Sequence, residues 1–398
     1  MKRILICWEH GTGLGHIVRL LPFARAFKKK GHCVAFAVHE TTNTHAIFEI
    51  EDFQWFQAPM NNLEFDEQIN HVHFYNYCRM IMCHDYHRFD ALLERVRKWE
   101  IIFNQFKPDV VIFEFSPGAY ITSLAFDVKR IMIGTGFTIP PLQYPFPCYK
   151  YMPNNMTFEQ RKNIEDQVTE NINNILAKIN AKSISYLFEI CKADLRLLMT
   201  YEELDYYKRF NENFYGVVPS TNQGIVPKWP KSNKKKKIFV YLHSEHTPPQ
   251  VMKALQQSGY SICTYIKEPK RLLLKYMSEN IKLLNSPANM QQVLKESDLV
   301  ICHAGHGTIS NVLMRGIPIL MFPLKNNIEQ YIVGRNIEKA GNGLCISNPK
   351  NVEEILFKMN ETLWNINIRE RAIQIAKKCT DLNDNGIFEK LFEYGGII

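Results

Sequence analysis

Short apolar runs of strand length alternate with amphipathic segments of helix length along most of the chain. Residues 2–8 and 32–38 read KRILICW and HCVAFAV, and the segment between them, 16–31, has helical apolar spacing and ends in lysines and a glycine. This order of strand, helix and strand is typical of a parallel sheet with crossover helices. The pattern recurs in PDVVIFEF at 108–115 and RIMIG at 130–134. The first half is therefore predicted to be an α/β domain.

The same alternation restarts in the second half. Six strand-like runs lie between residues 237 and 346, with helix-like segments between them. Before them, residues 216–237 lose apolar periodicity and are rich in Pro, Gly, Ser, Asn and Lys, which is typical of a linker. The predicted parts are a first domain over 1–220, a linker over 221–237, a second domain over 238–380, and a C-terminal helix over 381–398 for which packing back on the first domain is one arrangement.

Composition narrows the class of protein. A chain of 398 residues with 46% hydrophobic residues is long enough for two cores. Its opening lacks the apolar core of a signal peptide, and no stretch approaches the ~18 apolar residues of a membrane span. The ten cysteines lack CxxC spacing and read as reduced core thiols. We expect a cytoplasmic protein with at most peripheral contact to the inner face of a membrane.

The net charge of +8 raises the question of an anionic partner. Lysines and arginines are spread along the chain, apart from the run Lys234 to Lys237, and no nucleic-acid-binding module accompanies them. We therefore expect no nucleic-acid partner. The lysine run is interpreted as a solvated linker rather than a membrane-binding patch.

A glycine-rich turn joins the first predicted strand to the first predicted helix. It reads Gly11-Thr12-Gly13-Leu14-Gly15-His16, and Gly13 and Gly15 let a ligand approach the backbone amides at the helix start. A dinucleotide-binding fold is an alternative, for which Glu40 supplies the acidic residue after the second strand. Its spacing, however, is GxGxxG, whereas this turn is GxGxG and carries a histidine, so an NAD(P)-dependent oxidoreductase is the less favoured interpretation.

A second glycine-rich turn follows the apolar run DLVI in the other half. It reads CHAGHGTISN over residues 302–311. Gly305 and Gly307 bring the backbone close to a ligand, and the amides around Gly307 and Thr308 open a helix. This arrangement predicts a cradle for a diphosphate.

The two histidines of this turn have different expected roles. His303 is expected to donate a hydrogen bond to a phosphoryl oxygen, with a strand-end histidine satisfied by backbone as the alternative. For His306 a structural role at the helix start is favoured. A metal held by Cys302, His303 and His306 is disfavoured, because adjacent side chains on a strand point to opposite faces.

Three segments together resemble a known family. They are GLGHIVRLLPFARAFKKKGHCVAFAV at 13–38, PDVVIFEFSPGAYITSLAFDVKRIMIGTGF at 108–137, and the segment 302–346 that combines HxGxGT, GxPxLxxP and an acidic-Gln pair. They resemble the inverting glycosyltransferases of the GT-B fold, in particular the bacterial branch related to the glucuronosyl- and macrolide-type, UDP-glycosyltransferase-like enzymes. The resemblance implies two Rossmann-like domains with an interdomain cleft.

The resemblance also implies roles for the second domain. It would bind a nucleoside diphosphate-sugar, with UDP or dTDP as the nucleotide, and the pair Glu329 and Gln330 would read the sugar hydroxyls. A carboxylate that accepts and an amide that donates and accepts suit a polyol. The residues implied for the diphosphate are His303, Gly305, Gly307 and Thr308. Neither a metal nor another cofactor is expected, because these groups would stabilise the departing diphosphate.

In the first domain the resemblance implies a catalytic base at His16. An acceptor hydroxyl is a poor nucleophile, so a base placed against it is needed as it attacks the anomeric carbon. Inversion would follow from a single displacement. Relatives hold the histidine with an Asp at the end of the second quoted segment's strand, where this chain has Glu114; Glu9 is the alternative partner.

Two further segments are candidates for acceptor contact. One is the cluster HVHFYNYCRMIMCHDYHRF, interpreted as acceptor lining or plain packing, with a zinc site as the alternative; its candidate ligands are His71, His73, Cys78, Cys83, His84 and His87. The other is the aromatic loop Pro140 to Pro153, whose rings could stack on an acceptor, with a stiff surface connection as the alternative. The acceptor stays open among a lipid, an envelope glycan and a small molecule. A non-catalytic nucleotide- or carbohydrate-binding protein on the same scaffold is the rival function.

Overall fold

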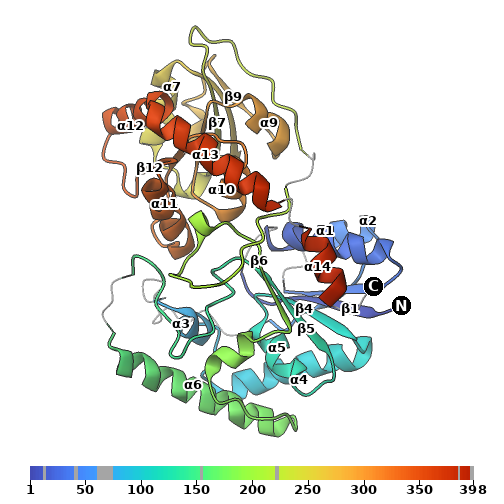
Figure 1. The fold of residues 1–398 in the computed structure, drawn as a ribbon. Helices are drawn as coiled ribbons and strands as arrows, with labels where there is room; N and C mark the ends of the chain where they lie inside the picture. The colour runs from blue at the N-terminus through green and yellow to red at the C-terminus, as the bar shows by residue number, and fades with distance from the viewer. Residues whose placement is uncertain are drawn as a thin grey trace. The chain divides into compact units, whose positions relative to one another are not determined.

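The chain folds into two compact units, which a computed structural model describes for residues 1–11, 15–39, 44–60, 75–152, 156–219, 224–383 and 386–394 (Figure 1). The first unit comprises Met1–Thr200, Asp205–Val218 and Asn385–Ile398, and the second comprises Tyr201–Leu204 and Pro219–Asp384. Each unit contains one six-stranded parallel sheet with helices packed against it. The predicted fold class, two Rossmann-like domains, is confirmed.

The sheet of the first unit has the strand order β3-β2-β1-β4-β5-β6. Its strands are β1 (Arg3–Trp8), β2 (Cys33–Val38), β3 (Gln54–Gln57), β4 (Val110–Glu114), β5 (Lys129–Gly134) and β6 (Leu195–Leu198). The central strands are buried on both faces, which explains why their sequences are continuous apolar runs. Successive side chains of β1 alternate between two cores: Leu5 and Cys7 enter one, and Ile4 and Ile6 enter the other.

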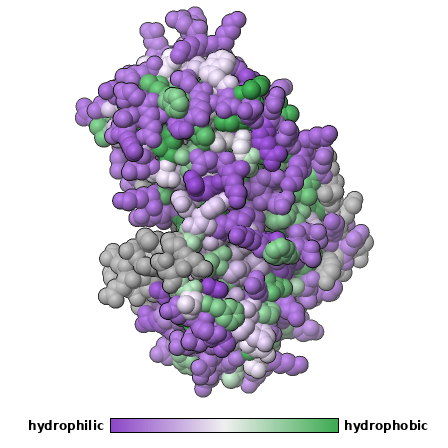
Figure 2. Space-filling view, turned by 60° about the vertical axis from the view of Figure 1, so that its left-hand side comes forward, coloured by the Kyte–Doolittle hydropathy of each residue, from purple (hydrophilic) through white to green (hydrophobic). Residues whose placement is uncertain are grey.

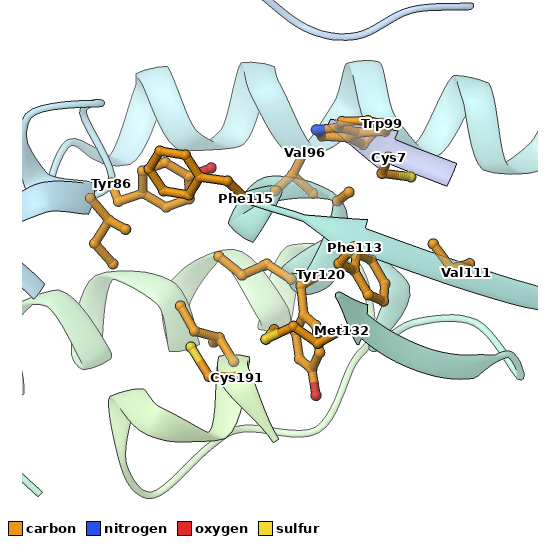
Figure 3. Close-up of a cluster of buried hydrophobic side chains, with 14 of the residues drawn as sticks. Cys7, Tyr86, Val96, Trp99, Val111, Phe113, Phe115, Tyr120, Met132 and Cys191 are labelled. Carbon is orange, nitrogen blue, oxygen red and sulfur yellow. The ribbon is translucent and has the colours of Figure 1, made fainter. Parts of the chain in front are cut away.

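Helices cover both faces of this sheet. The helices are α1 (Gly15–Lys29), α2 (His45–Ile50), α3 (Tyr77–Met82), α4 (Phe89–Phe106), α5 (Pro117–Ser123), α6 (Phe158–Lys178) and α14 (Ile387–Tyr394). Residues of α3, α4, α5 and α6 belong to one core, and residues of α1, α2 and α14 belong to the other. Figure 3 shows part of the first core, where Val96 and Trp99 of α4 lie over the strand that carries Phe113.

The long helix α6 shows how local sequence sets an element. Thr157 caps its first turn by accepting from the Gln160 amide, and the Gln160 side chain accepts in return from the Thr157 amide. The apolar stripe of this helix is buried in the core at Val168, Ile172 and Ile175. The helix is therefore held at its start by a capping box and along one face by packing.

The second sheet has the order β12-β11-β10-β7-β8-β9. Its strands are β7 (Lys237–His243), β8 (Ser261–Lys267), β9 (Ile281–Leu283), β10 (Leu299–Cys302), β11 (Ile319–Met321) and β12 (Gly343–Cys345). The helices of this unit are α7 (Pro249–Ser258), α8 (Arg271–Leu274), α9 (Met290–Glu296), α10 (His306–Leu313), α11 (Ile328–Ala340), α12 (Val352–Trp364) and α13 (Ile366–Asn383). On one face, Ile238, Val240 and Leu242 of β7 pack with buried residues of α7 and α12.

The C-terminal helix α14 packs on the first unit, although its neighbour in sequence, α13, belongs to the second. Leu391 and Phe392 are buried in the same core as Phe23 and Phe27 of α1, and the rings of Phe27 and Phe392 meet edge to face with centroids 5.3 Å apart. The chain therefore returns to its first unit after completing the second.

The molecular surface seen in Figure 2 is mostly hydrophilic, and the cysteines are present as thiols. In the view of Figure 2, hydrophilic residues dominate and hydrophobic residues appear in small groups. Across the described residues, no helix combines the length and the apolar character needed to cross a membrane. The ten cysteines are free thiols, and burial raises the pKa of Cys191 and Cys302 to about 12.

One buried acid of the first unit ties α6 to the aromatic loop. Glu165 Oε2 accepts from the Phe146 amide at 2.7 Å, and its other oxygen is buried without a hydrogen-bond partner among the described residues. Burial raises the pKa of Glu165 to about 7, although the Phe146 amide acts in the opposite direction. Ionisation of Glu165 therefore destabilises the folded state.

We predict that Glu165→Gln changes the pH dependence of stability. The pKa of Glu165 is higher in the folded state than in the unfolded chain, where it is near 4.3. Its protonation therefore stabilises the folded state fully below about pH 4.3, and this stabilisation is lost as the pH rises through the folded pKa of about 7. Glutamine does not titrate. The free energy of unfolding of the variant, relative to that of the parent, should therefore increase by up to about 3 kcal/mol from pH 5 to pH 8.

Urea denaturation at the two pH values measures this difference. The matched control is Glu170→Gln, which changes an exposed acid of the same helix. The difference in free energy of unfolding between this control and the parent should be the same at both pH values. A difference between Glu165→Gln and the parent that is flat with pH would contradict the assignment.

Candidate functional site

The strand order of the first sheet reverses between β1 and β4. Chain segments lead from β1 outward through β2 and β3 on one side, and from β4 through β5 and β6 on the other. Ligands of open α/β sheets bind beyond the carboxyl ends of the strands at such a point. Trp8 and Glu114 are paired in register at these ends, so the turn after β1 and the last residue of β4 lie at the same edge.

His16 and Glu114 meet at this edge. His16 is the second residue of α1, and its Nδ1 lies 2.6 Å from Oε2 of Glu114. Burial by itself raises the pKa of Glu114, but the contacts with His16 and Arg19 outweigh it and lower the pKa, so the group is a carboxylate at neutral pH. A carboxylate only accepts, so Nδ1 of His16 carries a proton and Nε2 of the neutral ring is left as the basic nitrogen.

Trp8 and Gly11 border the His16 ring, and Arg19 holds its carboxylate partner. The Trp8 indole stacks on the imidazole, with ring centroids 5.0 Å apart and an interplanar angle of 16°. Gly11 has a φ of +94°, and a Cβ placed there would lie 2.5 Å from His16 Nε2. Gly11 therefore meets two requirements, a backbone conformation that side chains disfavour and space beside the imidazole. Arg19, one turn along α1, donates to Glu114 Oε1 at 2.7 Å.

Glu9 belongs to a different buried network. Its Oε2 accepts from the Gly118 amide at 2.8 Å at the start of α5, and its Oε1 accepts from the Tyr86 hydroxyl at 3.0 Å. Arg95, itself buried, lies 3.4 Å from the same Oε1. The structure therefore pairs His16 with Glu114, whereas Glu9, the alternative partner considered from the sequence, balances Arg95 and caps α5.

His10 belongs to the same buried network as Glu9. Its Nε2 accepts from Arg95 Nη1 at 2.9 Å, and its ring stacks on His84 with centroids 3.9 Å apart. Burial, followed by the nearby charges of His84 and Arg95, lowers the pKa of His10 well below its usual range. His10 is therefore a neutral member of the Glu9 network.

The rest of the histidine and cysteine cluster shows no metal geometry in the parts that are described. His71 and His73 lie outside the described residues. Cys78 and Cys83 are buried on or just after α3, and burial raises the pKa of Cys78 well above its usual value. No group of three or more His, Cys, Asp or Glu side chains is arranged to hold a metal among the residues with described positions.

The aromatic loop is described up to residue 152, and Pro153 lies outside the described residues. The Tyr149 amide donates to the Tyr75 carbonyl at 2.8 Å, and the Tyr149 ring stacks on Phe137 with centroids 4.9 Å apart. The loop is thus packed onto its own unit through both backbone and ring contacts.

In the second unit the strand order reverses between β7 and β10. The turn after β10 leads into α10, whose N-cap is Gly305. No side chain caps the start of this helix in the described structure, and a Cβ built on Gly305 or Gly307 would meet no atom within 4 Å. The helix start near Thr308 is therefore an open end with its amides and positive dipole available to an anion.

His303 is held by the backbone on both sides of its ring. Nδ1 lies 2.7 Å from the Phe322 carbonyl oxygen, and Nε2 accepts from the His243 amide at 2.9 Å. Because both nitrogens are engaged, the expected hydrogen bond from His303 to a phosphoryl oxygen does not fit this arrangement, and the alternative of a strand-end histidine does. His303 instead joins the ends of β7, β10 and β11.

Glu329 and Gln330 lie in the first turn of α11. Asn327 caps this helix by accepting from the Gln330 amide at 3.0 Å, and Gln330 Oε1 accepts from the Leu324 amide at 3.0 Å. Both side chains are partly exposed. Gln330 therefore holds the preceding loop with its oxygen, and the pair forms a polar edge at the start of α11.

Among the predicted site residues of the first unit, Gly13 lies outside the described residues. Gly15 begins α1, and a Cβ added there would meet no atom within 4 Å.

The sequence interpretation missed Arg19 and Trp8. The spacing of three residues between His16 and Arg19 places both on one face of a helix, and this signal was present in the sequence.

Known proteins match the chain in two ways. Residues 230–381 match the glycosyltransferase family 28 C-terminal domain. The structure of the glycosyltransferase VinC in complex with dTDP is similar over 100% of both chains, with a TM-score of 0.69 and 13% identity. The chain has the GT-B glycosyltransferase fold. The GT-B resemblance seen in the sequence is therefore confirmed.

Curated relatives of this GT-B chain match it over shorter stretches. An uncharacterized glycosyltransferase of Methanosarcina acetivorans is 30% identical over 115 residues, which cover 29% of this chain and 30% of the relative. The UDP-N-acetylglucosamine--N-acetylmuramyl-(pentapeptide) pyrophosphoryl-undecaprenol N-acetylglucosamine transferase of Thermoanaerobacter sp. strain X514 is 31% identical over 109 residues, 25% of this chain and 30% of the relative. The matches thus span under a third of the length of these relatives.

We predict that Glu9→Ala destabilises the first unit of this GT-B chain. The change leaves the buried guanidinium of Arg95 without its carboxylate and the start of α5 without its cap, which costs about 3–5 kcal/mol. Chemical denaturation measures the loss. The matched control is Glu51→Ala, which breaks a partly exposed ion pair with Arg25 and should cost at most about 1 kcal/mol. Equal losses in the two variants would contradict the structural role of Glu9.

Proposed function

We propose that the protein is an inverting glycosyltransferase that moves a sugar from a nucleoside diphosphate-sugar, with UDP or dTDP as the nucleotide, to an acceptor hydroxyl without a metal ion. The observation that carries the proposal is the pair of His16 and buried Glu114 at the carboxyl edge of the first sheet. The family 28 domain over residues 230–381 supports the donor class.

In the proposed reaction His16 is the base. Its Nε2 takes the proton of the acceptor hydroxyl as the oxygen attacks the anomeric carbon, and the bond from that carbon to the diphosphate breaks. Glu114 stabilises the imidazolium that forms and holds the ring in the required tautomer. A single displacement from the face opposite the leaving group inverts the configuration.

The second unit is proposed to bind the donor. The open start of α10, at Gly305, Gly307 and Thr308, would receive the diphosphate, and its dipole would stabilise the charge that develops as the nucleotide leaves. The polar edge of Glu329 and Gln330 would read the sugar hydroxyls. We assign His303 to holding the cradle through the strand ends rather than to contacting the phosphate.

Two rival functions make different use of these residues. A non-catalytic nucleotide- or carbohydrate-binding protein needs the cradle but has no use for an ionised carboxylate oriented onto His16. An NAD(P)-dependent oxidoreductase needs the first glycine turn and an acid after β2; Glu40 lies outside the described residues. The acceptor class is left open among a lipid, an envelope glycan and a small molecule, and we propose a cytoplasmic location with at most peripheral membrane contact.

We expect nucleotide binding to separate these functions. Thermal unfolding is followed with UDP, dTDP, GDP, ADP, NAD or NADP, in buffer with EDTA. At a concentration of 100 times the Kd, a ligand that binds the folded state adds about 2.7 kcal/mol of stability, so UDP or dTDP should raise the Tm by several degrees. A rise with NAD or NADP alone would instead favour the oxidoreductase.

We also expect His16→Ala to lose transfer while it keeps the donor nucleotide. Loss of a positioned base lowers the rate by about 10²–10⁴-fold, whereas the cradle of the second unit is untouched. The rate is the release of nucleoside diphosphate from UDP- or dTDP-sugars with acceptor panels of polyprenyl phosphates, oligosaccharides and phenols. The matched control, His45→Ala, changes a partly exposed histidine of α2 and should keep the parent's rate. Parent-like turnover in His16→Ala would overturn the base assignment.

A further inference from the structure

Arg19 shares the carboxylate that orients the proposed base. Glu114 is fully buried, with one oxygen 2.6 Å from His16 Nδ1 and the other 2.7 Å from Arg19 Nη1. Arg19 is mostly buried itself, so solvent screens this contact weakly. The arrangement is therefore a carboxylate between two groups of α1, one permanently charged and one that titrates.

The permanent charge changes the balance of the pair. With Arg19 in place, neutral His16 belongs to a cluster of zero net charge, and protonation makes the cluster positive. Without Arg19, the same protonation would neutralise the buried carboxylate. Electrostatics in a buried site therefore make protonation of His16 less favourable when Arg19 is present.

Among the residues whose positions are described, other groups near the His16 ring do not supply this effect. On β1 the neighbour is the uncharged indole of Trp8, and Glu9 beyond it is engaged with Arg95. At the end of β2, the His39 ring lies edge-on to Trp8, with centroids 4.8 Å apart, and its Nε2 contacts the Gly11 carbonyl. From β4 the facing group is Glu114. In the described part of the chain, Arg19 is the cation that shares an acceptor with His16.

We propose that Arg19 is a positioning residue for the base: it locks the Glu114 carboxylate and makes protonation of His16 less favourable than Glu114 alone would. The inference rests on the proposed function of His16. It assigns to Arg19 a role in setting the pH range of the enzyme rather than a contact with substrate.

The direct test follows His16 protonation in the protein without ligands. Histidine Cε1–H signals are titrated by NMR in protein carrying ¹³C-labelled histidine, and the His16 signal is assigned by its loss in His16→Ala. In Arg19→Gln, which keeps a donor to Glu114 but removes the charge, the midpoint of the His16 titration should rise by about one pH unit or more. Arg19→Lys, which keeps the charge, should shift it by less than half as much.

The matched control is Arg25→Ala on the same helix. Arg25 pairs with Glu51 and not with Glu114, so the titration midpoint of His16 should match that of the parent. An unchanged or lower midpoint in Arg19→Gln would overturn the inference. If Arg19→Gln does not fold, Arg19→Lys and Arg19→Met are compared with each other, and equal His16 midpoints in these two variants would overturn it equally.

The rate profile supplies a second readout. In Arg19→Gln the acid limb of kcat/KM against pH should move to higher pH, with near-parent rates recovered at pH 9. A merely structural role would lower the rate at every pH, and that result would contradict the inference. Because the titration needs neither donor nor acceptor, failure of the transferase assay in the parent protein would reject the proposed function without deciding the role of Arg19.

Discussion

Both sheets run outward from a central pair of strands, and this reversal of strand order is the constraint on which the two candidate sites depend. In the first sheet α1 follows β1 onto one face and α5 follows β4 onto the other, as their membership of opposite cores shows. Two connections that leave in opposite directions keep the strand ends between them uncovered. Polar side chains can therefore be placed at these ends while the cores on both faces stay apolar.

Within that constraint, the surroundings decide what each buried acid does. Glu9 directly follows β1 and Glu114 ends the adjacent parallel strand β4, and both are removed from water. Glu9 accepts from the amides that begin α5 and pairs with Arg95, so its negative charge is compensated by groups of the fold itself. Glu114 faces α1 instead, where its two partners are the guanidinium of Arg19 and the imidazole of His16. The same chemical group thus balances a buried guanidinium and caps a helix at one strand end, and orients an imidazole at the next.

Much of this was predictable from the sequence because it depends on local pattern. Apolar runs predicted the parallel strands, and glycines after β1 and β10 predicted turns at their ends. The identity of the partner of His16 was not predictable, because Glu9 and Glu114 both follow apolar strands and only the direction of the side chains separates them. His303 shows the same limit: its two backbone partners, His243 and Phe322, lie at the ends of two different strands, so no spacing in the sequence reports them.

The chemistry proposed for each unit explains why sequence and fold similarity extend over different lengths. A diphosphate held by backbone amides needs small residues at fixed places before a helix, as at Gly305 and Gly307, and this requirement leaves a sequence signature; the family match covers residues 230–381. A base held by one side chain needs only a strand end and a helix start at the right distance. Glu114 with a supporting Arg19 satisfies that requirement, as other combinations of acid and cation also would. The first unit can therefore keep its fold, as the whole-chain similarity at 13% identity indicates, while the residues around its histidine change.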